Sequence, residues 1–190
     1  MATASLYQQF LRAVWKQLKR NYPFVKRFDK AISSAIPQSS SFSLGKSPLY
    51  DKYVILDFQH NSKPWGPGQF TINVRILSDL SQIDSLKHFQ DYRQAEDGNY
   101  RLGGEYYGYD RWWCLKDRDR TFDEQMKGIL KNFDPQIEDQ KFFEGKWRPS
   151  SFADPETVIQ EALDDVFPLL DDALFARFGF PIRHLSRSGI

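Results

Sequence analysis

The sequence predicts an α+β fold, a mainly antiparallel sheet of about five strands with helices packed on one face. Two neighbouring runs, 53–59 and 70–76, alternate apolar and polar residues and are joined by a proline- and glycine-rich segment, the pattern of an antiparallel strand pair. Apolar residues recur at helical spacing near both ends of the chain. A length of 190 residues is about one domain with its own core. We therefore expect a single domain over 1–190, with a basic helical start (1–36), a sheet containing one inserted helix (41–116) and a helical end (121–179).

The first of these elements is a basic helical start. Leu6, Phe10, Val14 and Leu18 share one face of a predicted helix that Pro23 ends. A second helical pattern runs over 24–35, and lysine and arginine are interleaved with both patterns. The basic face is interpreted as a solvated helix surface, and the alternative is a surface that binds phosphate groups or a partner.

A short strand is predicted at 42–44, before the central pair of strands. If Phe58 lies opposite Phe70, every apolar residue of the central pair falls on one face. Asp57 then lies opposite Thr71, and Tyr53 lies opposite Arg75. The reverse face is polar, and it is either solvated, covered by a helix or used for binding. Its residues are Tyr53, Asp57, Gln59, Thr71, Asn73 and Arg75, joined by Arg101 and Trp112.

After the central pair, the sequence predicts a surface helix over 81–94 and two more strands at 100–102 and 111–115. In the second of these strands alternation places Trp113 and Leu115 on one face and Trp112 and Cys114 on the other.

The helical end contains two predicted helices. A capping box at 121–124 starts the first, which continues to 133. The segment 138–151 is predicted to be irregular. Asp154 and Pro155 form a cap and a first turn for the last helix, which Gly179 ends. The acidic residues of this last helix are expected on its solvated side, opposite its apolar stripe: Asp164, Asp165, Asp171 and Asp172.

Composition restricts the partners and the compartment of this chain. The formal net charge is +1, with 26 basic and 25 acidic residues, so a global field that would attract nucleic acid is absent and nucleic acid is disfavoured as a partner. Cys114 is the only cysteine, which excludes an internal disulfide and favours a reducing, cytoplasmic setting. No apolar run reaches the length of a membrane span, and the first residues lack the pattern of an export signal. We expect no membrane partner.

No motif in the sequence predicts catalysis. Asp134 with 144–146 has the residue order of a metal-dependent nuclease, but it falls between predicted helices and is interpreted as a chance match. Cys114 is expected to be a buried thiol and not a nucleophile. The histidines do not have zinc-binding spacing, and the glycine pairs are not followed by the residues of a phosphate loop. We therefore predict no metal, no cofactor and no catalytic residue.

The order of elements resembles a bacterial family, the domain-of-unknown-function family numbered 4304. The features that resemble it are an amino-terminal helix, a strand ending in Asp57, Phe58 and Gln59, the alternating strand 70–74, a strand with Trp112 and Trp113, and a final helix. The resemblance covers 6–130, and the segments 46–50 and 138–152 are longer than such a domain implies. It implies an α+β fold and assigns no activity and no site residue.

These observations favour a noncatalytic binding or protein-interaction domain of bacterial origin, by analogy one that neutralises a toxin as immunity proteins do. The partner is expected to be another protein, and the oligomeric state is left open. The competing hypothesis is an enzyme that acts on a phosphate-containing or nucleic-acid substrate through Asp57, Arg75 and the basic helical start. The predicted binding residues are Tyr53, Asp57, Gln59, Thr71, Asn73, Arg75 and Trp112.

Overall fold

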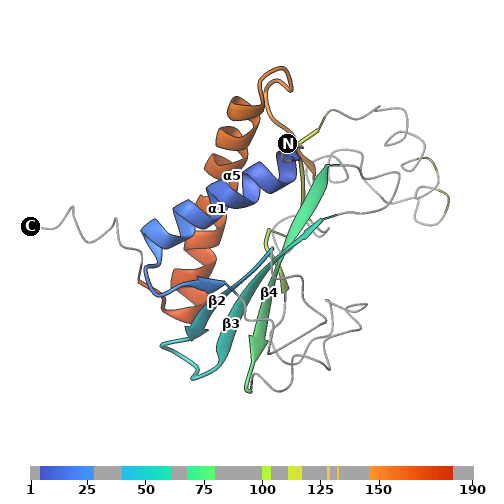
Figure 1. The fold of residues 1–190 in the computed structure, drawn as a ribbon. Coiled ribbons are helices and arrows are strands. Elements are labelled where there is room, and N and C mark those ends of the chain that lie inside the picture. The colour runs from blue at the N-terminus through green and yellow to red at the C-terminus, as the bar shows by residue number, and fades with distance from the viewer. Residues whose placement is uncertain are drawn as a thin grey trace, which may run out of the picture.

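The computed structural model describes residues 5–27, 40–60, 68–79, 100–103, 111–116 and 146–181, together with Gly128 and Asn132. This part of the chain forms an α+β fold, as predicted (Figure 1). No helix in it is long and apolar enough to cross a membrane. Its elements are α1 (Leu6–Asn21), β1 (Lys26–Arg27), β2 (Ser41–Lys46), β3 (Tyr53–His60), β4 (Gln69–Leu77), β5 (Tyr100–Arg101), β6 (Trp112–Cys114), β7 (Lys146–Trp147) and α5 (Pro155–Phe178).

The strands form one sheet in the order β1-β2-β3-β4-β6-β7, with β5 paired to β4 beside β6. Every pairing is antiparallel except the parallel pair β6 and β7. Among the described residues the sheet has seven strands, where about five were expected. Three of the seven, β1, β5 and β7, are only two residues long.

The central hairpin of β3 and β4 is confirmed, but the predicted register is wrong by two residues. Phe58 lies opposite Ile72, Asp57 opposite Asn73, and Arg75 opposite Ile55. A shift of two residues leaves every side chain on its predicted face, whereas a shift of one would have exchanged the faces. Alternation in the sequence determines the face, and it does not distinguish registers that differ by an even number.

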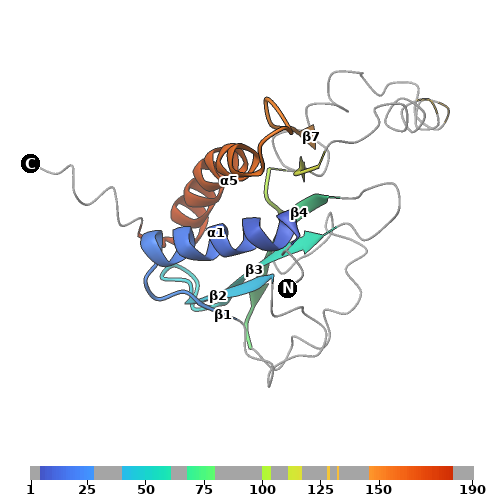
Figure 2. The same ribbon diagram turned by 45° about the horizontal axis from the view of Figure 1, so that its top comes forward.

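Both helices pack on the apolar face of the sheet, as predicted (Figure 2). The ring of Phe10 in α1 lies 4.6 Å from that of Phe70 and 6.2 Å from that of Phe58. Trp113 of β6 stacks on Phe70 at 5.4 Å and is fully buried. Leu115 joins the same core, which confirms the predicted faces of the β6 strand.

Both helices have defined caps, and those of α5 follow the prediction. Ser5 and Gln8 form a capping box at the start of α1. Asp154 accepts hydrogen bonds from two backbone amides in the first turn of α5. Gly179 ends α5 in the left-handed region at φ 70°, and a Cβ there would lie 2.8 Å from Cγ of Leu49. Glycine is therefore required both by the backbone and by the close approach of Leu49.

The helix predicted over 24–35 is wrong where the structure describes it. Lys26 and Arg27 form β1, opposite Ser43 and Phe42 of β2. Val25 is buried, while both side chains of β1 are exposed. Pairing with β2 supplies backbone partners at the sheet edge, and this tertiary interaction outweighs the local helical spacing. The rest of that predicted helix, from residue 28, lies outside the described residues.

The segment 138–151, predicted to be irregular, contains the strand β7 at Lys146–Trp147. Its pairing partner β6 is more than thirty residues earlier in the chain, so no local sequence pattern indicated that β7 is a strand. Trp147 is half-buried against the core. The predicted helix 81–94 lies outside the described residues, and within 121–133 only Gly128 and Asn132 are described, both helical.

Candidate functional site

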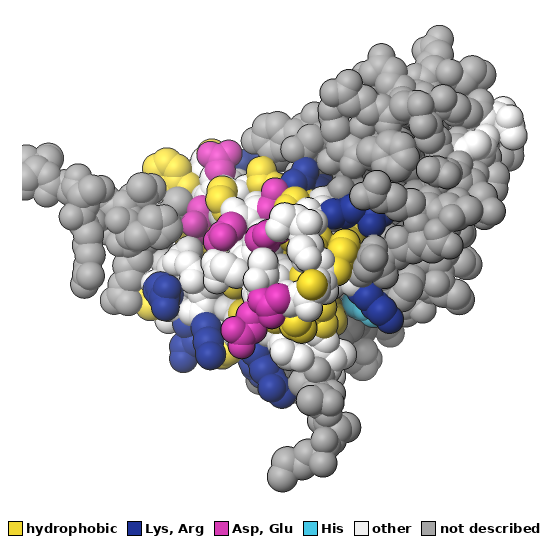
Figure 3. All heavy atoms as spheres, turned by 90° about the horizontal axis from the view of Figure 1, so that it is seen from above, with side chains coloured by type: hydrophobic (Ala, Val, Ile, Leu, Met, Phe, Trp, Pro, Cys, Tyr) yellow, Lys and Arg dark blue, Asp and Glu magenta, His cyan; other side chains and the backbone are white. Residues whose placement is uncertain are grey.

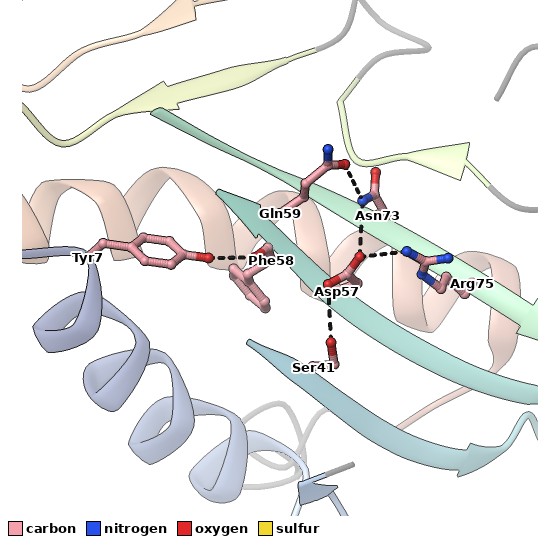
Figure 4. A network of polar contacts seen from close by, with 7 residues as sticks. All are labelled: Tyr7, Ser41, Asp57, Phe58, Gln59, Asn73 and Arg75. Carbon is pink, nitrogen blue, oxygen red and sulfur yellow. Dashed lines mark hydrogen bonds and ion pairs between the residues drawn. The ribbon is translucent and has the colours of Figure 1, made fainter. Parts of the chain in front are cut away.

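The polar face of the central strands holds a network of side chains around Asp57 (Figure 4). Oδ2 of Asp57 accepts hydrogen bonds from Nη2 of Arg75 at 2.7 Å and from Nδ2 of Asn73 at 3.3 Å. Its other oxygen, Oδ1, accepts from Oγ of Ser41 at 3.1 Å. Nδ2 of Asn73 also donates to Oε1 of Gln59 at 3.0 Å. The structure thus brings together four of the predicted site residues.

Most of this polar face is buried. Asp57, Thr71, Asn73 and Arg75 are at most 7% exposed, while Gln59 is exposed. Neither α1 nor α5 covers these residues, since both helices pack on the opposite face of the sheet. The sequence alone left exposure or burial open, and burial makes these side chains parts of the interior.

The other predicted members of the face have different partners. Oγ1 of Thr71 donates to the backbone carbonyl of Arg111 at 2.9 Å. The Tyr53 ring lies 5.5 Å from Nζ of Lys46. The structure therefore does not bring Thr71 and Tyr53 into the Asp57 network.

Trp112 also lies apart from the Asp57 network. Its ring lies under the guanidinium of Arg101 at 5.6 Å, and the indole is half-buried. Arg101 and Trp112 therefore contact each other on the face of the sheet opposite to that of Trp113.

The Asp57 network is built to hold charge, not to transfer protons. Three donors converge on the carboxylate, and one of them is a guanidinium. A general base must instead direct a free lone pair toward a substrate proton. Ser41 is the member that the sequence did not indicate, although the pairing of β2 with β3 places it directly opposite Asp57. We interpret the network as a buried ion pair that fixes the three central strands to one another.

A second feature is a groove between α1 and α5 with a volume of about 740 Å³. Pockets of this size hold small ligands or the side chains of a docked peptide. Its apolar lining comes from α5, and Phe175 within it is 56% exposed. The groove is lined by Gln17, Arg20, Asn21, Gln160, Leu163, Asp164, Phe167, Pro168, Asp171, Asp172 and Phe175.

Asp171 lies buried at this groove, which corrects the prediction that it is solvated. Its Oδ1 accepts a hydrogen bond from the Tyr22 hydroxyl at 2.6 Å, and its Oδ2 accepts from Nδ2 of Asn21 at 3.2 Å. Position 171 is four residues after Phe167 and three before Leu174, both buried, so it belongs to the apolar stripe of the helix. That spacing was the signal for its burial. Asp164 and Asp172 are exposed, as expected.

Asp165 is likewise not a solvated residue, because it connects α5 to the sheet. Its carboxylate accepts two hydrogen bonds from Nη2 of Arg111, at 2.8 and 2.9 Å, and one from Nε1 of Trp113 at 2.7 Å. The Arg111 side chain is 7% exposed. The periodicity of the helix alone could not indicate these partners, since Arg111 and Trp113 lie more than fifty residues earlier in the chain.

The hydroxyl of Tyr22 makes stability depend on pH in the alkaline range. Burial, together with the hydrogen bond to Asp171 and its charge, raises the pKa of Tyr22 above the ordinary value of 10.0. The folded state therefore favours the protonated phenol. This stabilisation is complete below pH 10.0 and is lost as the pH rises toward the folded-state pKa.

In Tyr22→Phe the unfolding free energy is expected to decline less steeply above pH 10.0 than in the unaltered chain. At neutral pH the substitution should lower the unfolding free energy by about 1.5–3 kcal/mol, because it removes a hydrogen bond to a charged group. Tyr50→Phe is the control, because Tyr50 is 59% exposed. Urea unfolding at several pH values measures both. Burial also raises the pKa of Tyr7, so part of the alkaline decline in unfolding free energy remains in both proteins. If this decline were equally steep in Tyr22→Phe and in the unaltered chain, the assignment to Tyr22 would be wrong.

Comparison with known proteins adds no assignment. No family model, no curated protein and no solved structure matches the chain. The resemblance to the family numbered 4304 stays a prediction. Within the described ranges no group of histidine, cysteine, aspartate and glutamate residues could hold a metal ion.

Proposed function

We propose that this protein is a noncatalytic protein-interaction domain and that the groove between α1 and α5 is its interaction surface. The observation that supports this most directly is Phe175, a large apolar side chain that is 56% exposed at the edge of an open groove. Exposed aromatic side chains beside grooves are typical of protein-binding surfaces. The polar face predicted from the sequence is a weaker candidate, because four of its side chains are buried.

The arrangement of charged residues argues against the enzyme hypothesis. That hypothesis combines Asp57 and Arg75 with the basic helical start on one substrate, and α1 contributes most of the described basic residues of that start. The exposed Lys16 and Lys19 of α1 lie on the helical side of the sheet, and the Asp57 network lies on the reverse face, with the hydrophobic core between them. Asp57 and Arg75 also bind each other. A single substrate of ordinary size therefore does not reach both the Asp57 network and these lysines of α1.

A photocrosslinker placed in the groove tests the proposed function. Phe175 is replaced by p-benzoylphenylalanine and the protein is irradiated in extract of the native cell. We expect discrete crosslinked proteins, identified by mass spectrometry. The control carries the same residue at Glu156, which is exposed on α5 outside the groove. Identical products from both positions, or no product from position 175, would refute the groove as an interaction surface.

A further inference from the structure

The groove between α1 and α5 is unbalanced in charge. Its lining includes the carboxylates of Asp164, Asp171 and Asp172 and one cationic side chain, Arg20. The imbalance continues beyond the groove, since α5 contains six acidic residues and Arg177, while α1 contains basic residues and no acidic one. Seen from the helical side, acidic side chains gather toward the middle of the described surface, with basic side chains at its lower left and on its right (Figure 3).

Neutral groups donate hydrogen bonds to two carboxylates of the groove. Asp171 receives hydrogen bonds from the Tyr22 hydroxyl and the Asn21 amide. Asp164 receives one from the Gln160 amide at 2.8 Å. Amide and hydroxyl donors stabilise a carboxylate and leave its net charge in place. The exposed carboxylates of Asp164 and Asp172 thus present negative charge to whatever enters the groove.

Apolar side chains lie between these charges. Leu163, Phe167 and Phe175 all line the groove on α5. Asp164 and Asp172 are eight residues apart on the same helix, which corresponds to about 12 Å along its axis. Two cationic side chains separated by two turns of a docked helix would match that spacing. An apolar groove between helices commonly receives the apolar face of an amphipathic helix.

We propose that the partner inserts a cationic amphipathic helix into this groove. Its lysine or arginine side chains pair with Asp164 and Asp172, and its apolar side chains pack on Leu163, Phe167 and Phe175. The proposal rests on the proposed function and adds the chemistry of the partner. It concerns a different protein, not a second copy of this chain. Among the described helices the basic one, α1, already buries its apolar face against the sheet, so α1 of a second copy could offer only its charged side.

The test uses a synthetic peptide of about 18 residues that folds as an amphipathic helix of leucine and lysine. A matched peptide has glutamate in place of lysine. Fluorescence anisotropy measures the binding of each to the full chain. We expect the lysine peptide to bind, with an affinity that falls as salt is raised, and the glutamate peptide to bind at least about tenfold more weakly.

Two variants locate the binding. The double variant Asp164→Asn with Asp172→Asn is expected to bind the lysine peptide about tenfold more weakly than the unaltered chain. Glu156→Gln removes a charge from the same helix outside the groove, and it should change the affinity by less than about twofold. Phe175→Ala should also weaken binding, because it removes apolar contact area. Circular dichroism checks that each variant folds.

Each contrary result has a distinct meaning. If Glu156→Gln weakens binding of the lysine peptide as much as the double variant does, the attraction is nonspecific and the proposal is wrong. If the glutamate peptide binds as tightly as the lysine peptide, the proposal of a cationic partner is wrong. The proposed function of the groove would still be supported if position 175 forms crosslinks. A crosslinked product of twice the chain mass would identify a second copy and overturn this proposal. Absence of any crosslink from position 175 removes the proposed function itself.

Discussion

Asp57→Ala is expected to lower the free energy of unfolding by about 3–5 kcal/mol, the cost of leaving one member of a buried ion pair without its partner. The Arg75 and Asp57 side chains are 9% and 5% exposed, and their charged atoms are 2.7 Å apart. The substitution also removes the acceptor of the Ser41 and Asn73 hydrogen bonds. Urea unfolding followed by tryptophan fluorescence measures the loss.

An exposed ion pair provides the control for this prediction. Nζ of Lys46 and Oδ1 of Asp51 are 2.8 Å apart, and these side chains are 47% and 83% exposed. Lys46→Gln should leave the unfolding free energy almost unchanged, because water screens the pair. The double variant Asp57→Leu with Arg75→Met should recover much of the stability lost in Asp57→Ala, since it leaves no buried charge. A loss in Asp57→Ala as small as that in Lys46→Gln would contradict the buried network.

Trp113→Ala is expected to cost about 3–5 kcal/mol, the range for removal of a large aromatic side chain from a core. Trp113 is fully buried and stacks on Phe70 at 5.4 Å. Its indole nitrogen donates to Asp165, which joins α5 to the sheet. The substitution therefore removes both packing and a hydrogen bond to a carboxylate. Thermal and urea unfolding measure the effect.

The neighbouring tryptophan supplies a matched control. Trp112 has the same chemistry and the same strand, but it points to the opposite face and is half-buried. Trp112→Ala should cost clearly less than Trp113→Ala. A reversed order of the two losses would mean that the alternation of β6 has been assigned to the wrong faces.

Features encoded in contiguous residues were predictable from the sequence. Asp154 with Pro155 and the terminal Gly179 define α5, because caps act through backbone groups within a few residues. The alternation of β3 and β4 predicted a hairpin with one apolar face, because side chains in strands point to opposite faces in turn. Asp57, Asn73 and Arg75 were correctly placed on a shared face for the same reason.

Features that depend on long-range pairing were not predictable. Nothing near Lys26 or Lys146 in the sequence indicates the strands with which they pair. Asp165 was assigned to solvent because its partner Arg111, which directly precedes β6, is distant in the sequence. The groove between α1 and α5 likewise depends on how two helices pack, and single-helix periodicity contains no information about the partner helix.

The two-residue strands β1 and β7 lie at opposite edges of the sheet. Long, flat edge strands offer unpaired backbone groups to strands of other molecules, which is a route to aggregation. At one edge here, Lys26 and Arg27 are both exposed, and their charges repel a second copy of the same edge. A short, charged border of this kind disfavours pairing of β1 with a strand of another molecule, which would extend the sheet beyond this edge.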